Sequence, residues 1–133
     1  MRAILSRETG TIRKPHAGRL RVALAFPNTY NVGMSNLGFQ TAYRLFNEAE
    51  EVSCERVFLP PRSELNASSA QAAPAERLVS LETQTALADF DVLAFSVSFE
   101  WDYVNLLTML RLAGLPLRAA ERNRHHPLVV LGG

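Results

Sequence analysis

Residues 91–98 constrain the fold most, because Asp-Val-Leu-Ala-Phe-Ser-Val-Ser is a nearly continuous apolar run of strand length that ends in two serines. A strand that is apolar on both faces is typical of a parallel sheet covered by helices on both sides. A buried helix can show the same short pattern, but the Val and Phe content and the polar stop at Ser96 and Ser98 favour a strand. We therefore predict the central strand of an open α/β sheet, in which ligands lie beyond the carboxyl ends of the strands.

Similar apolar runs recur along the chain, separated by segments with helical periodicity. The predicted strands are residues 20–26, 53–59, 91–97 and 127–131, and the predicted helices are residues 36–49 and 102–113. Right-handed crossovers between them predict the flavodoxin-like strand order 2-1-3-4. The prediction is a three-layer, Rossmann-like α/β fold with a mostly parallel sheet and helices on both faces. Residues 62–74 are predicted to form a surface connection, and residues 78–82 a short edge strand.

Both predicted helices carry start signals and apolar stripes. Ser35 and Asp102 are expected to be N-caps, because short polar side chains accept hydrogen bonds from the free N–H groups at a helix N-terminus. Gly114 suits the position after the second helix. The apolar stripes are Phe39, Ala42, Tyr43, Phe46 and Ala49 in the first helix, and Tyr103, Leu106, Leu107, Leu110 and Ala113 in the second.

The first 19 residues are predicted to be a basic arm that precedes the α/β domain of residues 20–133. Two short apolar segments, residues 3–5 and 11–12, flank Glu-Thr-Gly and suggest a small hairpin. His16 is expected to be an exposed linker residue. Six basic residues precede Val22, against one acid, Glu8; they are Arg2, Arg7, Arg13, Lys14, Arg19 and Arg21. Such an arm is either solvated or able to contact RNA or a phosphate.

Composition narrows the class of protein. The 133 residues suit one domain with a core, and the net charge of +1 gives no general argument for a nucleic-acid partner. The single cysteine, Cys54, cannot form an internal disulfide or a cysteine-only iron–sulfur site, and we expect it to be buried in a strand. No segment has the length of a membrane span or the apolar core of a secretory signal, so we expect no membrane partner and a cytoplasmic location.

The chain ends on Gly132-Gly133, directly after the last predicted strand. A strand followed by two glycines is typical of a strand-to-loop junction at the ligand edge of a parallel sheet. We therefore expect one more helix and strand to complete the sheet, supplied by a longer polypeptide or by a partner. An open sheet edge is also expected to permit self-association.

Several phrases, taken together and in this order, resemble a known family. They are Phe-Pro-Asn-Thr-Tyr-Asn-Val-Gly-Met-Ser-Asn-Leu-Gly at residues 26–38, Cys-Glu-Arg-Val-Phe at 54–58, Leu-Ala-Asp-Phe-Asp-Val-Leu-Ala-Phe-Ser at 87–96 and Leu-Ala-Gly-Leu-Pro-Leu-Arg at 112–118. The region from Leu20 to Gly133 resembles the N-terminal region of a family of radical S-adenosylmethionine (SAM) proteins. In that family a cobalamin-binding-like Rossmann domain precedes the radical barrel.

The resemblance implies two domains with different functions. The barrel of the family carries a Cys-x3-Cys-x2-Cys motif that holds a 4Fe-4S cluster, and this motif is absent here. The cluster, SAM and the catalytic residues are therefore expected in a barrel after residue 133. This chain would be the non-catalytic accessory domain, with that barrel as its intramolecular partner.

The resemblance also identifies candidate cofactor-binding residues. Cobalamin domains carry Asp-x-His-x-x-Gly after the first strand, and the matching loop has Asn28, Tyr30 and Gly33, so the histidine that coordinates cobalt is missing. A phenol is a poor cobalt ligand because its ordinary pKa is about 10. The loop after the central strand in that family is Ser-x-x-Thr-like, which Ser96 and the nearby Ser98 match in part. A Gly-Gly pair follows the next strand in the family and matches Gly132 and Gly133.

Two functions from different classes remain open at this point. The first is an accessory domain that covers the radical barrel and helps to bind substrate or a cobalamin-like cofactor. The second is a Rossmann-like interaction module that binds a partner protein or RNA through its open sheet edge and basic arm. A concave, partly apolar pocket at the ligand edge favours the first, and a closed edge with exposed apolar patches elsewhere favours the second.

Overall fold

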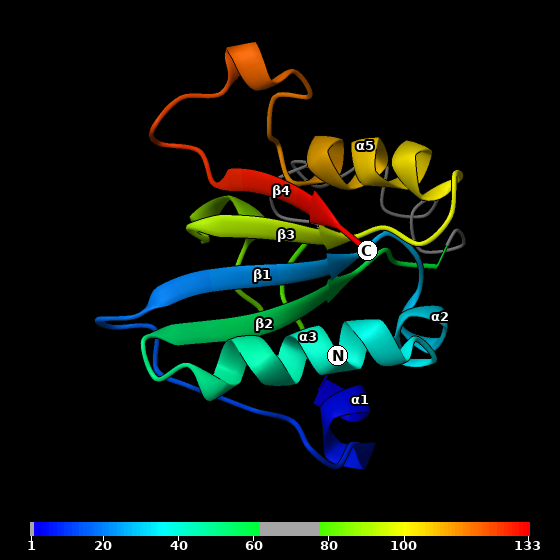
Figure 1. Cartoon of the computed structure of the whole chain (residues 1–133), viewed down its shortest axis with the longest axis vertical. Helices are drawn as coiled ribbons and strands as arrows, with labels where there is room; N and C mark the ends of the chain where they lie inside the picture. Colours follow the sequence, from blue (N-terminus) through cyan, green and yellow to red (C-terminus); the bar gives the residue numbers. More distant parts are fainter. Residues whose placement is uncertain (1, 62–77) are drawn as a thin grey trace.

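Four strands form an all-parallel sheet in the order β2-β1-β3-β4 in the computed structural model, which describes residues 2–61 and 78–133 (Figure 1). The strands are β1 (Leu20–Phe26), β2 (Val52–Phe58), β3 (Val92–Ser96) and β4 (Leu128–Gly132). This confirms the predicted Rossmann-like α/β fold and the predicted strand order. The surface connection predicted for residues 62–74 lies outside the described residues.

Register within the sheet places the ends of the strands at a common edge. Val22 lies between Cys54 of β2 and Val92 of β3, and Ser96 of β3 lies beside Gly132 of β4. All four strands run in one direction, so their carboxyl ends and the loops that follow them gather at one side, the right-hand side of Figure 1.

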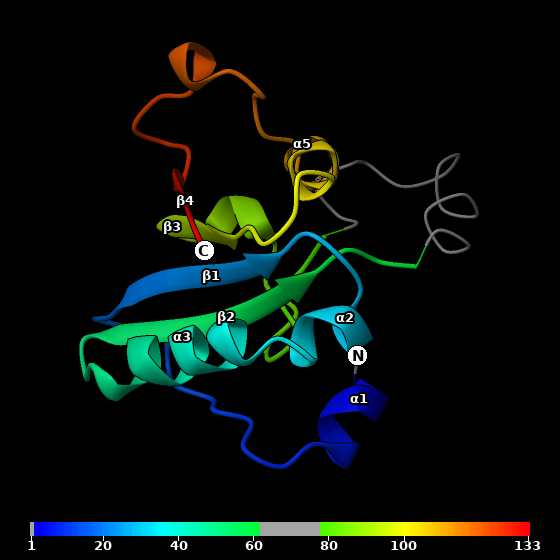
Figure 2. The same ribbon diagram turned by 45° about the vertical axis from the view of Figure 1, so that its right-hand side comes forward.

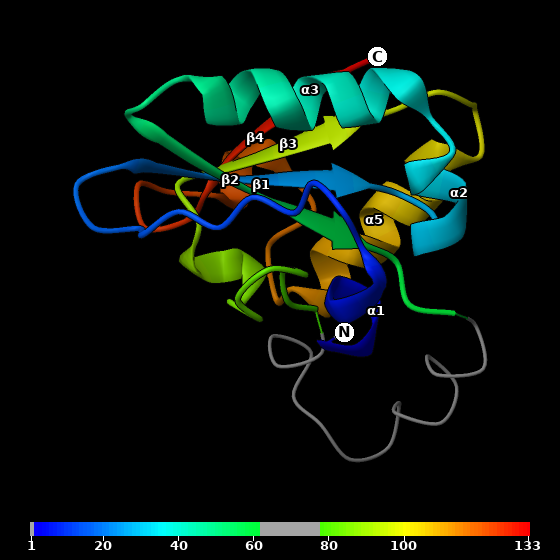
Figure 3. The ribbon, with the colours of Figure 1, turned by 90° about the horizontal axis from the view of Figure 1, so that it is seen from below.

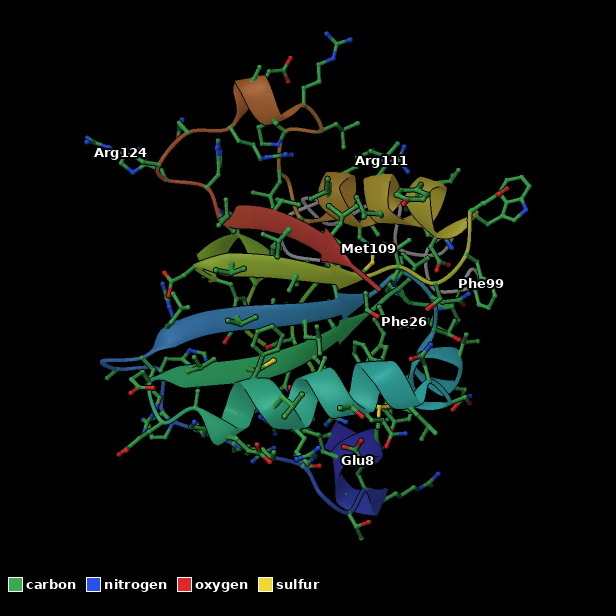
Figure 4. All side chains as sticks on the ribbon, in the orientation of Figure 1. Glu8, Phe26, Phe99, Met109, Arg111 and Arg124 are labelled. Atoms are coloured by element: carbon green, nitrogen blue, oxygen red, sulfur yellow. The ribbon has the colours of Figure 1, made fainter. Side chains whose placement is uncertain are left out.

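Helices cover both faces of the sheet (Figure 3). On one face, α3 (Leu37–Glu48) packs on β2 around a core of Val22, Leu24, Phe26, Phe39, Tyr43, Cys54 and Ala94. On the other face, α5 (Asp102–Leu112) lies over a core of Ala23, Ala25, Val57, Leu78, Leu87, Phe90, Leu93, Phe95, Leu106, Met109, Leu110, Leu112, Ala113 and Leu115. Figure 4 shows Met109 between α5 and the strands, and Arg111 on the outer side of the helix. The three predicted layers are therefore present.

The remaining elements are short. They are α1 (Arg2–Arg7), α2 (Tyr30–Met34), η2 (Leu87–Asp89) and η3 (Ala119–Glu121). From α1 the N-terminal arm runs along α3 to the start of β1 (Figure 2). Within residues 2–61 and 78–133, no helix combines the length and the apolar character needed to cross a membrane.

The predicted hairpin in the arm is wrong, because residues 2–7 form a helix. Alanine, leucine and arginine are good helix formers, and they dominate this segment. Ile12 does not pair with the first segment. Its N–H donates to the Tyr43 hydroxyl (2.9 Å), and the same hydroxyl donates to its carbonyl (3.1 Å). The arm is thus fastened to α3 rather than folded on itself.

The segment predicted as an edge strand at residues 78–82 is also different. It forms one antiparallel bridge, between Val79 and Ala86, at the base of a tight turn. Ser80 N–H donates to the Thr85 carbonyl (2.8 Å), which closes the turn and ends any strand. The Leu81 N–H donates to the Arg56 carbonyl (2.8 Å), so the turn itself covers part of the outer edge of β2.

Two predicted caps are wrong by one residue. The N-cap of α3 is Asn36, whose Oδ1 accepts from the Phe39 N–H (2.9 Å), because Ser35 instead closes the preceding helix α2. Asp102 is the first residue of α5, and its carboxylate accepts hydrogen bonds from loop residues rather than from the helix. Gly114 has φ +72° after α5, as its predicted position requires.

The predicted apolar stripe of α5 is only partly buried. Leu106, Leu110 and Ala113 are buried, whereas Tyr103 is 56% exposed and Leu107 is 46% exposed. Met109 and Leu112 take their places in the core. The sheet contacts a narrower stripe than the helix offers, so one apolar face of α5 remains at the surface.

Candidate functional site at the carboxyl edge of the sheet

Four of the predicted site residues meet where β3 and β4 end. Ser96 pairs with Gly132 across the two strands, and Val97 N–H donates to the Gly132 carbonyl (2.8 Å). Gly133 lies so close to β3 that a Cβ there would be 2.2 Å from the Val97 carbonyl oxygen. Its φ of +146° also suits glycine alone. Gly132, in contrast, has nothing within 4 Å of where a Cβ would lie.

Ser98 connects this corner to the loop after β1. The Asn36 side-chain amide donates to Ser98 Oγ (3.2 Å), so the start of α3 is joined to the loop after β3. Asp102 Oδ2 accepts from the N–H groups of Ser98 (2.9 Å) and Phe99 (3.0 Å). Because Asp102 is 3% exposed and satisfied by these two donors, it holds the loop in shape.

The other three predicted site residues face toward β2. Asn28 accepts from its neighbour Thr29, and its carbonyl accepts from the Leu59 N–H (2.9 Å). A Cβ at Gly33 would be 2.5 Å from the Phe58 ring. Tyr30 stacks edge-on against that ring (5.3 Å between centroids), and its hydroxyl donates to Glu8 (3.0 Å). These three residues therefore form a contact with the arm and β2, separate from the Ser96–Gly132 corner.

This arrangement does not fit cobalt ligation by the loop after β1. Burial raises the pKa of Tyr30, and the neighbouring Glu8 carboxylate raises it further, so the phenol keeps its proton. That proton is donated to Glu8, and the side chain points toward the arm. Neither Asn28 nor Gly33 supplies the nitrogen ligand that the missing histidine would provide.

An apolar rim borders the same carboxyl edge. Phe99 is 68% exposed and Trp101 is 79% exposed in the loop between β3 and α5, and Leu37 at the start of α3 is 78% exposed. Figure 4 shows Phe99 projecting away from the sheet. We call Leu37, Phe99, Trp101, Tyr103 and Val104 the aromatic rim. Large apolar side chains grouped at the surface are typical of a binding surface.

A second polar site, at the middle of β2, was not predicted. Arg56 is 2% exposed, and its Nε donates to Glu82 (2.6 Å) while its backbone N–H donates to the other Glu82 oxygen (2.8 Å). The two terminal nitrogens bind the Glu8 carboxylate, Nη2 at 2.8 Å from Oε2. The guanidinium also lies over the Tyr43 ring, 4.5 Å from its centroid. Burial is tolerated because both carboxylates are hydrogen-bonded to the one guanidinium.

The directions of the pKa shifts in this cluster follow from its geometry. Burial raises the pKa of Glu8, but the hydrogen bonds from Arg56 and Thr11 outweigh it, so the net effect is a lowered pKa. Burial works against the charge of Arg56, yet Glu8 and Glu82 raise the pKa of Arg56 above its ordinary value. Burial raises the pKa of Glu82, and Arg56 partly opposes this increase.

Glu55, next to Arg56, is buried on the opposite face of β2. Its Oε1 accepts from the hydroxyls of Ser80 (2.6 Å) and Thr83 (2.7 Å), and its Oε2 lies 2.5 Å from His16 Nε2. The prediction that His16 is an exposed linker residue is therefore wrong. The reason lies in the tertiary structure. A buried carboxylate requires hydrogen-bonding partners, and the arm supplies one of them, His16.

A sequence signal for this second site exists. Glu55 and Arg56 are adjacent charges in the middle of a strand whose other residues are mostly apolar. Charged residues at strand centres are rarely buried unless they are paired. The pattern therefore signals an ion-pair cluster, but it does not identify Glu8 and Glu82 as the partners.

Cys54 does not fit an iron–sulfur ligand. It is 1% exposed, and burial raises the pKa of its thiol well above the ordinary value. The ligand of a cluster is a thiolate. Within the described ranges no group of three or more His, Cys, Asp or Glu side chains is arranged to hold a metal ion.

Comparison with known proteins places the chain in a family. A sequence model of the family described as "Radical SAM proteins, N-terminal" matches residues 38–133, more than two thirds of the chain. No curated protein and no solved structure matches it. The matched region begins in α3 and includes β2, β3, α5 and β4, so it contains most of the sheet and the Ser96–Gly132 corner. The chain therefore belongs to the family that forms the N-terminal region of radical SAM proteins.

Proposed function

We propose that this chain is the N-terminal accessory domain of a radical SAM iron–sulfur enzyme, non-catalytic by itself, which covers the mouth of the catalytic barrel. The observation that carries the proposal is the aromatic rim at the carboxyl edge, in a member of a family that forms the N-terminal region of such proteins. Parallel α/β sheets bind their ligands at this edge. A rim with a 79% exposed tryptophan is suited to docking on another apolar surface.

The polar groups at the edge support a structural rather than a catalytic role. Asn36 is engaged with Ser98, and the Asp102 carboxylate is engaged with two backbone N–H groups. Cys54 is buried and burial raises the pKa of its thiol, which supports the proposal that the 4Fe-4S cluster and SAM are bound by the barrel. When bound there, they supply the radical chemistry; the part of this chain is to close the site and exclude water.

Tryptophan fluorescence tests the docking. Trp101 is the single tryptophan of the chain, and its exposure gives an emission close to that of tryptophan in water. Adding a separately produced radical SAM barrel, the partner in this proposal, is expected to shift this emission to the blue. Phe99→Ala is expected to weaken the complex about tenfold. Leu117→Ala, a matched control at a side chain that is 46% exposed, is expected to bind as the wild type does. An unshifted emission would leave the interaction-module alternative as the better account.

The finer proposal concerns a cofactor. The open space at Gly132, next to Ser96 and Ser98, permits the close approach of a flat ligand such as cobalamin, held without a cobalt ligand from this chain. Titration with hydroxocobalamin followed by desalting tests this, with retained visible absorbance as the readout. Gly132→Leu is expected to abolish retention by filling that space. No retention by the folded wild type would restrict the domain to a covering role.

A further inference from the structure

The Arg56 cluster contains one more carboxylate than is needed to neutralise the charge of Arg56. Glu82 alone neutralises Arg56, through the hydrogen bonds to its Nε and backbone N–H. The two terminal nitrogens of the guanidinium are left as a fork directed at a second carboxylate, that of Glu8. Such a fork matches the two oxygens of a carboxylate, and it recurs wherever carboxylates are recognised.

The Glu8 carboxylate is bound in the way that a ligand is bound. Oε1 accepts from Arg56 Nη1 and from the Tyr30 hydroxyl (3.0 Å), and Oε2 accepts from Arg56 Nη2 (2.8 Å) and from the Thr11 hydroxyl (2.7 Å). Four donors thus converge on two oxygens. Tyr43 beneath the guanidinium and Glu82 on its other side fix the orientation of the fork.

The segment that supplies Glu8 is weakly attached. Helix α1, directly before Glu8, has no buried residue, and Figure 4 shows Glu8 between this small helix and α3. Ile4 and Leu5 in this helix are only half-buried, and a segment with few buried apolar contacts opens at a low free-energy cost. Two of the donors, Arg56 and Tyr30, belong to β2 and α2, so they are not part of the segment that carries Glu8.

A cavity of about 800 Å³ adjoins the Glu8 carboxylate. Arg2 and Arg13 line it together with Glu82, Thr83 and Gln84, so it places two cations beside the fork. Gln84 has a φ of +54°, a conformation that non-glycine residues seldom adopt. The volume suits a small molecule, and the two further arginines suit a second acidic group.

We propose that Arg56 and Tyr30 form a binding site for a small dicarboxylate, which Glu8 fills from within the chain and from which an external acid displaces it. One carboxylate of the ligand takes the place of the Glu8 carboxylate on the Arg56 fork and the Tyr30 hydroxyl. The other lies in the cavity with Arg2 and Arg13. The proposal stands independently of docking on the barrel, because the site is on the arm side of β2, away from the aromatic rim.

Glu8→Ala with glutarate as the probe tests the site. The variant is expected to unfold at a lower temperature than the wild type at pH 7. Glutarate at ten times its Kd is expected to raise this temperature by roughly 5 °C, at constant ionic strength. Glu121→Ala, an exposed glutamate on η3, is the matched control and is expected to show no saturable rise. An equal response of both variants would overturn the proposal.

Two further measurements separate a binding site from a general charge effect. Adding Tyr30→Phe to Glu8→Ala removes one donor and is expected to weaken glutarate about three- to tenfold; an unchanged affinity would contradict the proposed geometry. If Glu8→Ala does not fold, Glu8→Gln takes its place, because the neutral amide keeps the shape of the side chain. An octaglutamate peptide is tested in parallel with glutarate. Tighter binding by the peptide would reject a small molecule as the ligand.

The wild-type chain tests displacement itself. Trypsin cleavage after Arg7, the residue before Glu8, reports whether the turn that carries Glu8 is detached, and saturating glutarate is expected to accelerate it several-fold. Succinamide, of similar length but without charge, serves as the control. Binding to Glu8→Ala without any change in the wild type would overturn displacement and leave Glu8 as a permanent part of the structure.

Discussion

Two glycines of the predicted site differ in the space around them, which leads to a first prediction. Gly33→Ala is expected to destabilise the chain by about 1–3 kcal/mol, because its Cβ would overlap the Phe58 ring, which Tyr30 and Phe39 hold in place. Gly132→Ala, with open space around it, is expected to change stability by less than about 0.5 kcal/mol. Urea unfolding of both variants checks this, and equal effects would contradict it.

A second prediction concerns pH. Since the folded-state pKa of Glu8 is lowered from 4.5, its contribution to stability is present above that value and is lost as the pH falls through the lowered pKa. Glu8→Gln is therefore expected to be less stable than the wild type at pH 7 and to approach it below pH 4.5. Urea unfolding across this range measures the difference, with Glu121→Gln as the control. A difference independent of pH would assign the effect to packing.

Individual site residues could be predicted from the sequence only where topology decides their place. Ser96 and Gly132 follow neighbouring parallel strands, so their proximity is a consequence of strand order. The direction of Tyr30 could not be predicted, because its partner Glu8 lies 22 residues earlier in an arm whose path no periodicity determines. Long-range polar partners of this kind depend on tertiary structure alone.

At the scale of elements, the outer edge of β2 carries a third prediction. The Asn47 side chain on α3 accepts from the Cys54 N–H (2.9 Å) and donates to the Cys54 carbonyl (3.1 Å), as a neighbouring strand would. Asn47→Ala leaves both buried groups unpaired, so we expect a loss of about 1–3 kcal/mol. Asn31→Ala, at an exposed asparagine, is the control in the same unfolding measurement. Equal losses would show that the pairing contributes nothing.

The elements themselves were predicted well because apolar periodicity determines them. The four strands and both long helices lie within one or two residues of their predicted bounds. The failures have local causes. Periodicity gave α5 a wider apolar stripe than the sheet covers, and nothing in residues 2–7 separated a short helix from one arm of a hairpin, because both contain the same few apolar residues.

At the scale of the whole molecule, strand β4 predicts self-association. Leu128, Val130 and Leu131 are 64%, 40% and 51% exposed. The backbone groups of Leu128 and Gly132 face β3, so those of Val129 and Leu131 face outward. Sedimentation is expected to show a dimer that forms with rising concentration, and Leu131→Lys is expected to abolish it. Leu45→Lys, at a leucine that is 53% exposed on α3, should leave it unchanged; loss in both variants would exclude β4 as the contact.

The closed outer edge of β2 limits how far such association proceeds. The Asn47 amide occupies the positions at Cys54, and Leu81 and Glu82 occupy those at Arg56. Among the strands described, β4 is therefore the one whose outer edge is open to pairing. When two copies pair through β4, neither has a second open edge in the described part of its sheet. The expected product is a two-fold symmetric pair rather than a growing fibre. The asparagine on α3, together with the turn that carries Leu81 and Glu82, is thus expected to limit the number of copies that the sheet can join.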